Sequence, residues 1–147
     1  MISDRLKLNN NSNEIERFYQ WISSYFSRTS LPNPVTYAIE MALEELILNS
    51  MSHGKRNSQE SDDNPGEIEI YIQFDPEEAS REVTITVSDD CEPFNPLAAE
   101  QADTETALEQ RQIGGLGIHL TRKQMDTIEY RRESNKNIMI MKKKIGE

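Results

Sequence analysis

Hydrophobic and polar residues alternate in three stretches of the chain, and this alternation predicts strands. The segment ISDRLKLN, residues 2–9, gives the first of them. Residues 67–75 (EIEIYIQFD) and 82–90 (EVTITVSDD) place large aliphatic side chains at every second position. Side chains two apart on a strand share a face, so these two segments predict an antiparallel pair that covers one layer of a core. The core faces would hold Ile68, Ile70, Ile72 and Phe74 on one strand and Val83, Ile85 and Val87 on the other.

Two stretches after the first strand repeat their hydrophobic residues at helical spacing instead. The first covers residues 11–26, with Ser12 or Asn13 as its predicted cap. The second covers residues 31–54; it begins with prolines and stops at a glycine, which is the order expected of a helix. The predicted core stripes are Ile15, Phe18, Tyr19, Ile22 and Phe26 in the first helix and Ile39, Leu43, Leu46, Ile47 and Ser50 in the second.

The rest of the chain divides into loops, a glycine-rich turn and two more strands. Residues 55–66 contain no large apolar side chain and predict an exposed loop. After Pro96 an acidic stretch predicts a short helical turn and then a mobile segment. Residues 113–125 (IGGLGIHLTRKQM) predict a turn leading into a helix, and residues 126–134 and 136–145 predict strands around a Ser-Asn turn. This order favours an α+β fold, a two-layer α/β sandwich with helices on one face of a mainly antiparallel or mixed sheet.

Length, charge and cysteine content narrow the class of protein. A chain of 147 residues fits one domain, residues 1–147. The net charge of −10 argues against direct nucleic-acid binding, although Arg122 to Lys144 carry a local +5, which leaves solubility or a charge-guided protein partner as alternatives. No apolar run approaches the roughly 20 residues of a membrane span, and no signal peptide is evident. With Cys91 as the single cysteine, we expect a cytoplasmic protein with no disulfide and no membrane attachment.

Three features could carry chemistry, and each has a plain structural alternative. Glu45 and Asn49 lie four apart on a helix beside its apolar stripe, where they form either a solvated edge or a site for a divalent cation and a general base. Asp89 shares the parity of the three aliphatic residues before it, so it is either an ordinary aspartate at a strand end or an inward carboxylate that needs a donor, such as the exocyclic amine of a purine. Gly114 to Gly117 form an ordinary turn or a backbone cradle for phosphate.

Taken in this order, the three features resemble the motifs of the GHKL ATPase/kinase superfamily, whose members share the Bergerat ATP-binding fold. Residues 42–54 (ALEELILNSMSHG) are similar to its N-box, residues 87–98 (VSDDCEPFNPLA) to its G1 box, and residues 113–144 to its G2 box and the tail that follows. The anti-sigma factor serine-protein kinases of the RsbW type resemble the chain most. No histidine-phosphorylation domain precedes the ATP module, so we do not expect a self-contained sensor histidine kinase.

The resemblance implies a role for each matching residue. Glu45 corresponds to the catalytic base and Asn49 to the Mg²⁺ ligand, while Asp89 corresponds to the residue that binds adenine. The wider set of ATP contacts implied in this way is Asn49, His53, Asp89, Phe94, Arg111, Gly115, Leu116, Gly117 and Ile118. Two departures matter: the third position of the G1 box is Cys91 instead of glycine, and the ATP lid, residues 98–112, is short with Arg111 as its one basic residue.

By this resemblance the protein would be an ATP-dependent serine/threonine-protein kinase that requires Mg²⁺. It would phosphorylate an anti-anti-sigma protein of the STAS type, sequester a sigma factor when that antagonist is phosphorylated, and form a homodimer. A second hypothesis is a non-catalytic module in which nucleotide only shapes a surface that binds a partner, as Cys91 and the sparse lid suggest. A third is an α+β structural or interaction domain that binds no nucleotide.

Overall fold

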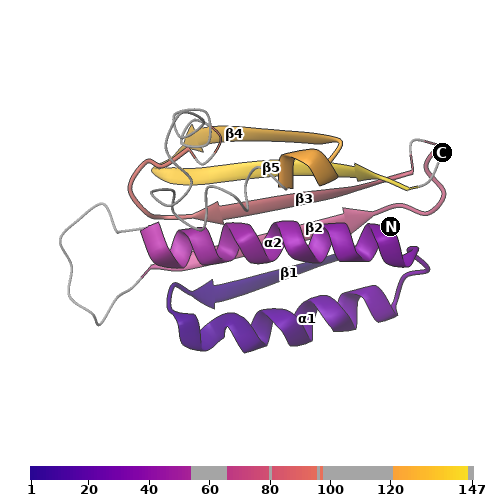
Figure 1. The fold of residues 1–147 in the computed structure, drawn as a ribbon, viewed down its shortest axis with the longest axis horizontal. Coiled ribbons are helices and arrows are strands. Elements are labelled where there is room, and N and C mark those ends of the chain that lie inside the picture. The colour runs from indigo at the N-terminus through magenta and orange to yellow at the C-terminus, as the bar shows by residue number, and fades with distance from the viewer. Residues whose placement is uncertain (54–65, 80, 96, 98–120, 146–147) are drawn as a thin grey trace.

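A computed structural model of the chain describes residues 1–53, 66–79, 81–95, 97 and 121–145, and within them one sheet is covered by two long helices (Figure 1). The strands lie in the order β1-β2-β3-β5-β4, and every neighbouring pair is antiparallel. This arrangement confirms the predicted α+β fold. The strands are β1 (Ile2–Asn9), β2 (Glu67–Phe74), β3 (Glu82–Asp89), β4 (Thr127–Glu133) and β5 (Lys136–Lys144), and the helices are α1 (Ile15–Ser27) and α2 (Asn33–His53).

The core lies between the helices and one face of the sheet. In β2 and β3 burial alternates along the strand, and the seven side chains predicted to face the core are all buried. In β5 the alternation continues through Met139 and Met141, which were not part of that prediction. The period of two therefore identifies the core face correctly across the middle of the sheet.

Both helices bury the stripes that their spacing predicts, with one addition. All five stripe residues of α2 are buried. In α1, Phe18 and Ile22 are buried and the other three stripe residues are partly buried against the core. Tyr25, outside the predicted stripe, is also fully buried, and its hydroxyl donates a hydrogen bond of 2.8 Å to the carbonyl oxygen of Ile2 in β1. This bond satisfies the polar end of a ring that otherwise sits in the core.

The start of α1 differs from the prediction. A turn of 3-10 helix, η1 (Ser12–Glu14), precedes α1, and the side chain that caps it is Asn11, whose Oδ1 accepts from the Asn13 N–H at 3.0 Å. The prediction that Ser12 or Asn13 caps this helix was therefore wrong. Glu14 is the N-cap residue of α1 and makes no side-chain cap; its carboxylate accepts instead from the Asn9 N–H at 2.7 Å.

The β4–β5 hairpin closes through the predicted Ser-Asn turn. Ser134 and Asn135 have φ values of 53° and 62°, as a two-residue turn of type I′ requires. Residues 121–124 are helical, in agreement with a helix ahead of β4. The predicted glycine-rich turn, the lid and most of the predicted loop at 55–66 lie outside the described residues. In the described part of the chain no helix has the length and apolar character needed to cross a membrane.

Candidate functional site

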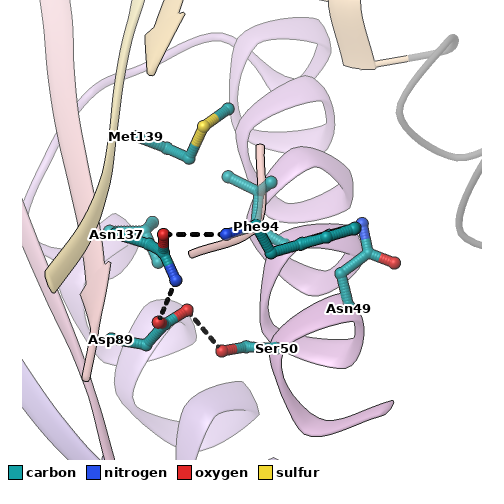
Figure 2. A pocket seen from close by; sticks show the side chains of 8 residues that line it. Asn49, Ser50, Asp89, Phe94, Asn137 and Met139 are labelled. Carbon is teal, nitrogen blue, oxygen red and sulfur yellow. Dashed lines mark hydrogen bonds between the residues drawn. The ribbon is translucent and has the colours of Figure 1, made fainter. Parts of the chain in front are cut away.

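A small cavity lies where the C-terminal part of α2 faces the ends of β3 and β5 (Figure 2). Its volume is about 30 Å³, which is room for about one or two water molecules. A nucleotide base could enter only if the surrounding side chains moved apart. The lining residues are Leu46, Asn49 and Ser50 from α2, Val87 and Asp89 from β3, Phe94 from the segment that follows, and Asn137 and Met139 from β5.

Strand register brings the polar lining residues together. Asp89 is the last residue of β3, and its Cα partner in β5 is Asn137, the second residue of that strand. Directly opposed residues of an antiparallel pair present their side chains to the same face. Both side chains therefore point toward α2, where Ser50 meets them. The parity argument that turned Asp89 inward agrees with this placement.

Asp89 accepts hydrogen bonds from three donors. Its Oδ2 accepts from Ser50 Oγ at 2.6 Å, and its Oδ1 accepts from Asn137 Nδ2 at 2.9 Å and from the Cys91 N–H at 3.1 Å. These bonds supply the donors that an inward carboxylate requires. A carboxylate has about four acceptor positions, so one lone pair of Oδ2 has no donor among these contacts.

Cys91, which replaces the expected glycine, does not line the cavity. The φ angle of Cys91 is not positive, so the backbone at this position does not require glycine. Its buried Sγ accepts from Asn10 Nδ2 at 3.3 Å, and the same amide donates to the Ser50 carbonyl oxygen at 3.3 Å. Burial, with the nearby charge of Asp89, raises the pKa of the thiol to about 12 and keeps it neutral. The Asn10 side chain thus joins the β1–η1 turn both to the end of α2 and to Cys91.

Glu45 and Asn49 lie one turn apart on α2 in different surroundings. Asn49 is buried, 6% exposed, and lines the cavity, with its amide pointing away from Asp89 in Figure 2. Glu45 does not line the cavity. Its Oε2 is buried and has no hydrogen-bond partner within the described structure. Desolvation by burial, and then the charge of Glu44, raise the pKa of Glu45 to about 7.

Glu44, the preceding residue of the helix, has a hydrogen-bond partner. Its carboxylate accepts a hydrogen bond from the Tyr19 hydroxyl of α1, and this bond is the main reason that the pKa of Tyr19 is raised to about 12. The two adjacent glutamates therefore differ in their hydrogen bonding. Glu44 links the two helices, whereas Glu45 keeps a carboxylate oxygen that nothing in the described chain satisfies, which is the condition expected of a proton acceptor.

The remaining predicted site residues divide into two groups. Phe94 lines the cavity and its N–H donates to Asn137 Oδ1 at 3.1 Å. His53 is the last residue of α2, and its contact with phosphate stays a prediction. The predicted phosphate contacts that lie outside the described residues are Arg111, Gly115, Leu116, Gly117 and Ile118.

Sequence reasoning missed two polar members of the site. Ser50 was assigned to the core stripe, although its hydroxyl is a donor to Asp89. Asn137 was not singled out, although it shares the parity of Met139 and Met141 along β5. The rule that turned Asp89 inward would have turned Asn137 inward as well. The signal was therefore present in the sequence.

Comparison with known proteins bears on the family and on the fold. A family model described as a histidine kinase-like ATPase domain matches residues 8–143. The curated proteins give no match. Among solved structures, the RsbU and RsbW domains of Rv1364c from Mycobacterium tuberculosis superimpose with a TM-score of 0.61 at 11% identity; the match covers 97% of this chain and 32% of that one. This chain therefore spans about a third of that chain's length, and at such low identity the likeness concerns the fold alone.

Two further solved structures are less similar. The histidine kinase domain of the blue-light activated histidine kinase from Erythrobacter litoralis EL346 matches at 12% identity, over 90% of this chain and 60% of that one, with a TM-score of 0.49. The Acinetobacter baumannii histidine kinase AdeS matches at 14% identity, over 98% of this chain and 68% of that one, with a TM-score of 0.45.

Proposed function

Because the chain belongs to the histidine kinase-like ATPase family, which confirms the GHKL resemblance and makes ATP its nucleotide, we propose that it is a serine/threonine-protein kinase. It would transfer the γ-phosphoryl group of ATP to a hydroxyl of a small protein substrate. The observation that carries this proposal is the state of Glu45. A buried carboxylate oxygen without a partner, on a group whose pKa is about 7, is suited to accept a proton near neutral pH.

In the proposed reaction the substrate hydroxyl oxygen forms a bond to the γ-phosphorus while the bond between that phosphorus and the β,γ-bridging oxygen breaks. ADP leaves, and Glu45 takes the hydroxyl proton. Positioning and charge neutralisation supply most of the catalysis in phosphoryl transfer, so one well-placed base is sufficient. Asp89 would orient the adenine by accepting from its exocyclic amine with the remaining lone pair of Oδ2.

The donor set near Glu45 fits Mg²⁺ bound mainly through phosphate and water. Mg²⁺ keeps several waters and is commonly held by only one or two protein oxygens. The described residues contain no cluster of three or more His, Cys, Asp or Glu side chains, so a cage made wholly of protein ligands is not built there. The buried Asn49 amide would supply the protein oxygen, and the ion would neutralise phosphate charge. Phosphate contacts from His53, Arg111 and the backbone of Gly115 and Gly117 belong to the same proposal.

The proposed biological setting is a partner switch. The fold likeness to a protein with RsbU and RsbW domains supports an anti-sigma factor of the RsbW type, with a STAS-type antagonist as the phosphoryl acceptor and a sigma factor as the sequestered partner. A cytoplasmic homodimer is proposed with it.

The competing function is a nucleotide-binding module without transfer. The small volume of the cavity, about 30 Å³, bears equally on both functions, because each requires the cavity to open for the base.

Labelled ATP, Mg²⁺ and a STAS-type protein whose gene lies near this one would test the proposal. We expect label to appear on Ser or Thr of the STAS protein. Glu45→Ala should abolish transfer while it keeps nucleotide affinity, since Glu45 does not line the cavity. Glu40→Ala, which removes a carboxylate elsewhere on α2, is the matched control and should transfer at the normal rate. If the unmodified protein binds ATP without transfer to any such substrate, the binding module is the correct function.

A further inference from the structure

Asn137 is the most heavily hydrogen-bonded side chain of the candidate site. It is 6% exposed and lies in β5, paired with Asp89 of β3 on one side and with Arg132 of β4 on the other. Its Oδ1 accepts from Tyr130 Oη at 2.6 Å, from the Phe94 N–H at 3.1 Å and from Arg132 Nη1 at 3.2 Å. Its Nδ2 donates to Asp89 Oδ1 and to the Glu92 carbonyl oxygen, both at 2.9 Å. One amide therefore joins three strands and the segment after β3.

These partners fix the orientation of the Asn137 amide. The Phe94 N–H and the Arg132 guanidinium can only donate, so the atom facing them must be the oxygen. The Glu92 carbonyl oxygen can only accept, so the atom facing it must be the nitrogen. Each end of the amide thus has at least one partner that can act only as a donor or only as an acceptor. The Nδ2–H directed at Asp89 follows from this chemistry and does not depend on an arbitrary choice between amide oxygen and nitrogen.

We propose that Asn137 is the positioning residue of the base subsite, because its amide holds Asp89 as a pure acceptor and leaves one oxygen position free for a base that presents an amino group. This inference rests on the proposed nucleotide site. Among the hydrogen bonds of the described residues, the Cys91 N–H and Asn137 Nδ2 are both on Oδ1 and Ser50 Oγ is on Oδ2, so the position without a donor lies on Oδ2. An aminopurine would donate to that position, whereas an oxopurine would place an acceptor against it. Arg132 supports the same arrangement by donating to the Cys91 carbonyl oxygen at 2.8 Å.

Replacing the amide by a carboxylate tests this role. Asn137→Asp keeps the shape of the side chain and its contacts with Arg132 and Tyr130, but it places a second carboxylate against Asp89 and the Glu92 carbonyl oxygen. The titratable and charged side chains in contact with Asn137 are Asp89 of β3 and Tyr130 and Arg132 of β4. Asp90, Cys91 and Glu92 follow Asp89 in the chain, and Glu92 contacts Asn137 through its carbonyl oxygen. Two carboxylates in contact raise one pKa strongly, so at lower pH a shared proton replaces the lost N–H.

Calorimetric titration with ADP across about pH 8 to about pH 5.5 gives the readout. Relative to the unmodified protein, Asn137→Asp should bind ADP about tenfold more weakly at the upper end, as expected for a lost hydrogen bond to a charged group, and should regain most of that affinity at the lower end. Asn135→Asp, the same substitution two residues earlier in an exposed turn, is the matched control. It should show the affinity and pH profile of the unmodified protein.

A second variant covers the case in which Asn137→Asp does not fold. Asn137→Ser is shorter and neutral, and it should lower ADP affinity at every pH without recovery in acid. If either folded variant binds ADP like the unmodified protein across the pH range, the positioning role is overturned while the proposed function is unaffected. If the unmodified protein does not bind ADP at all, both the proposed function and this inference are overturned.

Discussion

At the scale of one residue, the surroundings of Glu45 do not stabilise the negative charge of its carboxylate. Its buried oxygen has no donor in the described structure, and the adjacent Glu44 is a second carboxylate. Because the folded state raises the pKa of Glu45 from 4.5 to about 7, this group leaves stability at its highest below pH 4.5, and stability is lost as pH rises from there through about 7. Above that range the ionised form is held at a cost to stability.

We therefore predict that Glu45→Gln raises the melting temperature at about pH 8 and changes it little at about pH 5, where the native carboxyl is already neutral. Thermal unfolding followed by circular dichroism at the two pH values measures the difference. Glu78→Gln, an exposed carboxylate in the β2–β3 connection, serves as the control and should show no such pH dependence. An equal or lower melting temperature for Glu45→Gln at the higher pH would contradict the buried, unpaired state of this carboxylate.

The site residues differ in how far sequence could identify them. The inward direction of Asp89 follows from strand parity, and Asn137 carries the same signal in β5. Helical spacing places Glu45 and Asn49 one turn apart. It cannot tell which of two adjacent glutamates finds a partner, because Tyr19 reaches Glu44 only through the packing of α1 against α2. The state of Glu45 therefore emerges from tertiary structure.

Among the elements, the β4–β5 hairpin is the part of the sheet that holds Asn137 in register with Asp89. Its turn requires positive φ at two successive residues, Ser134 and Asn135, neither of which is glycine. Gly accepts this conformation readily because it has no side chain, and Asn accepts it more readily than most residues because its short side chain tolerates the left-handed region. Asn135 therefore favours the turn, whereas Ser134 disfavours it slightly.

Asn135→Ala should destabilise the protein by about 1 kcal/mol, because alanine pays the steric cost of the left-handed conformation without the compensating local hydrogen bonding of asparagine. For a protein of this size the melting temperature should fall by about 2–4 °C. Asn135→Gly should equal or exceed the stability of the unmodified protein. If Asn135→Ala melted at the same temperature as the glycine variant, the positive φ would not be a constraint on this residue.

The elements themselves were largely predictable, and the exception has a local cause. Alternation identified the strands because one face of the sheet is buried against helices, so that every second residue must be apolar. The start of α1 was mispredicted because Asn11 forms a side-chain bond two residues ahead, to the Asn13 N–H, and so caps a 3-10 turn. Competition between such neighbouring polar side chains is decided by small differences in backbone geometry.

For the molecule as a whole, the proposed function predicts stabilisation by nucleotide. A ligand that binds only the folded state adds about 2.7 kcal/mol at a concentration of 100 times its dissociation constant. ADP or ATP with Mg²⁺ should therefore raise the melting temperature by several degrees. In Asp89→Asn this shift should be strongly reduced, because the amide loses acceptor capacity toward the adenine amine.

The unmodified protein and Asp89→Asn must be compared by the rise in melting temperature that nucleotide causes in each, and not by their melting temperatures alone. Asp89→Asn also disturbs the bonds from Ser50, Cys91 and Asn137, so its unliganded melting temperature is expected to fall. Unchanged nucleotide affinity in this variant would refute the assigned adenine contact. No shift in the unmodified protein would support the third hypothesis, that of a structural or interaction domain.

The pairing of β3 with β5 also has a consequence for how the protein folds. Asp89 and Asn137 are 48 residues apart in sequence, whereas β2 with β3 and β4 with β5 are neighbours joined by short connections. Closing the longer loop costs more chain entropy, so we infer that the two hairpins form before they join. The base subsite straddles that junction and exists only once it has closed. Nucleotide would then slow the unfolding rate of the finished protein while leaving the first, hairpin-forming steps of refolding at their intrinsic speed.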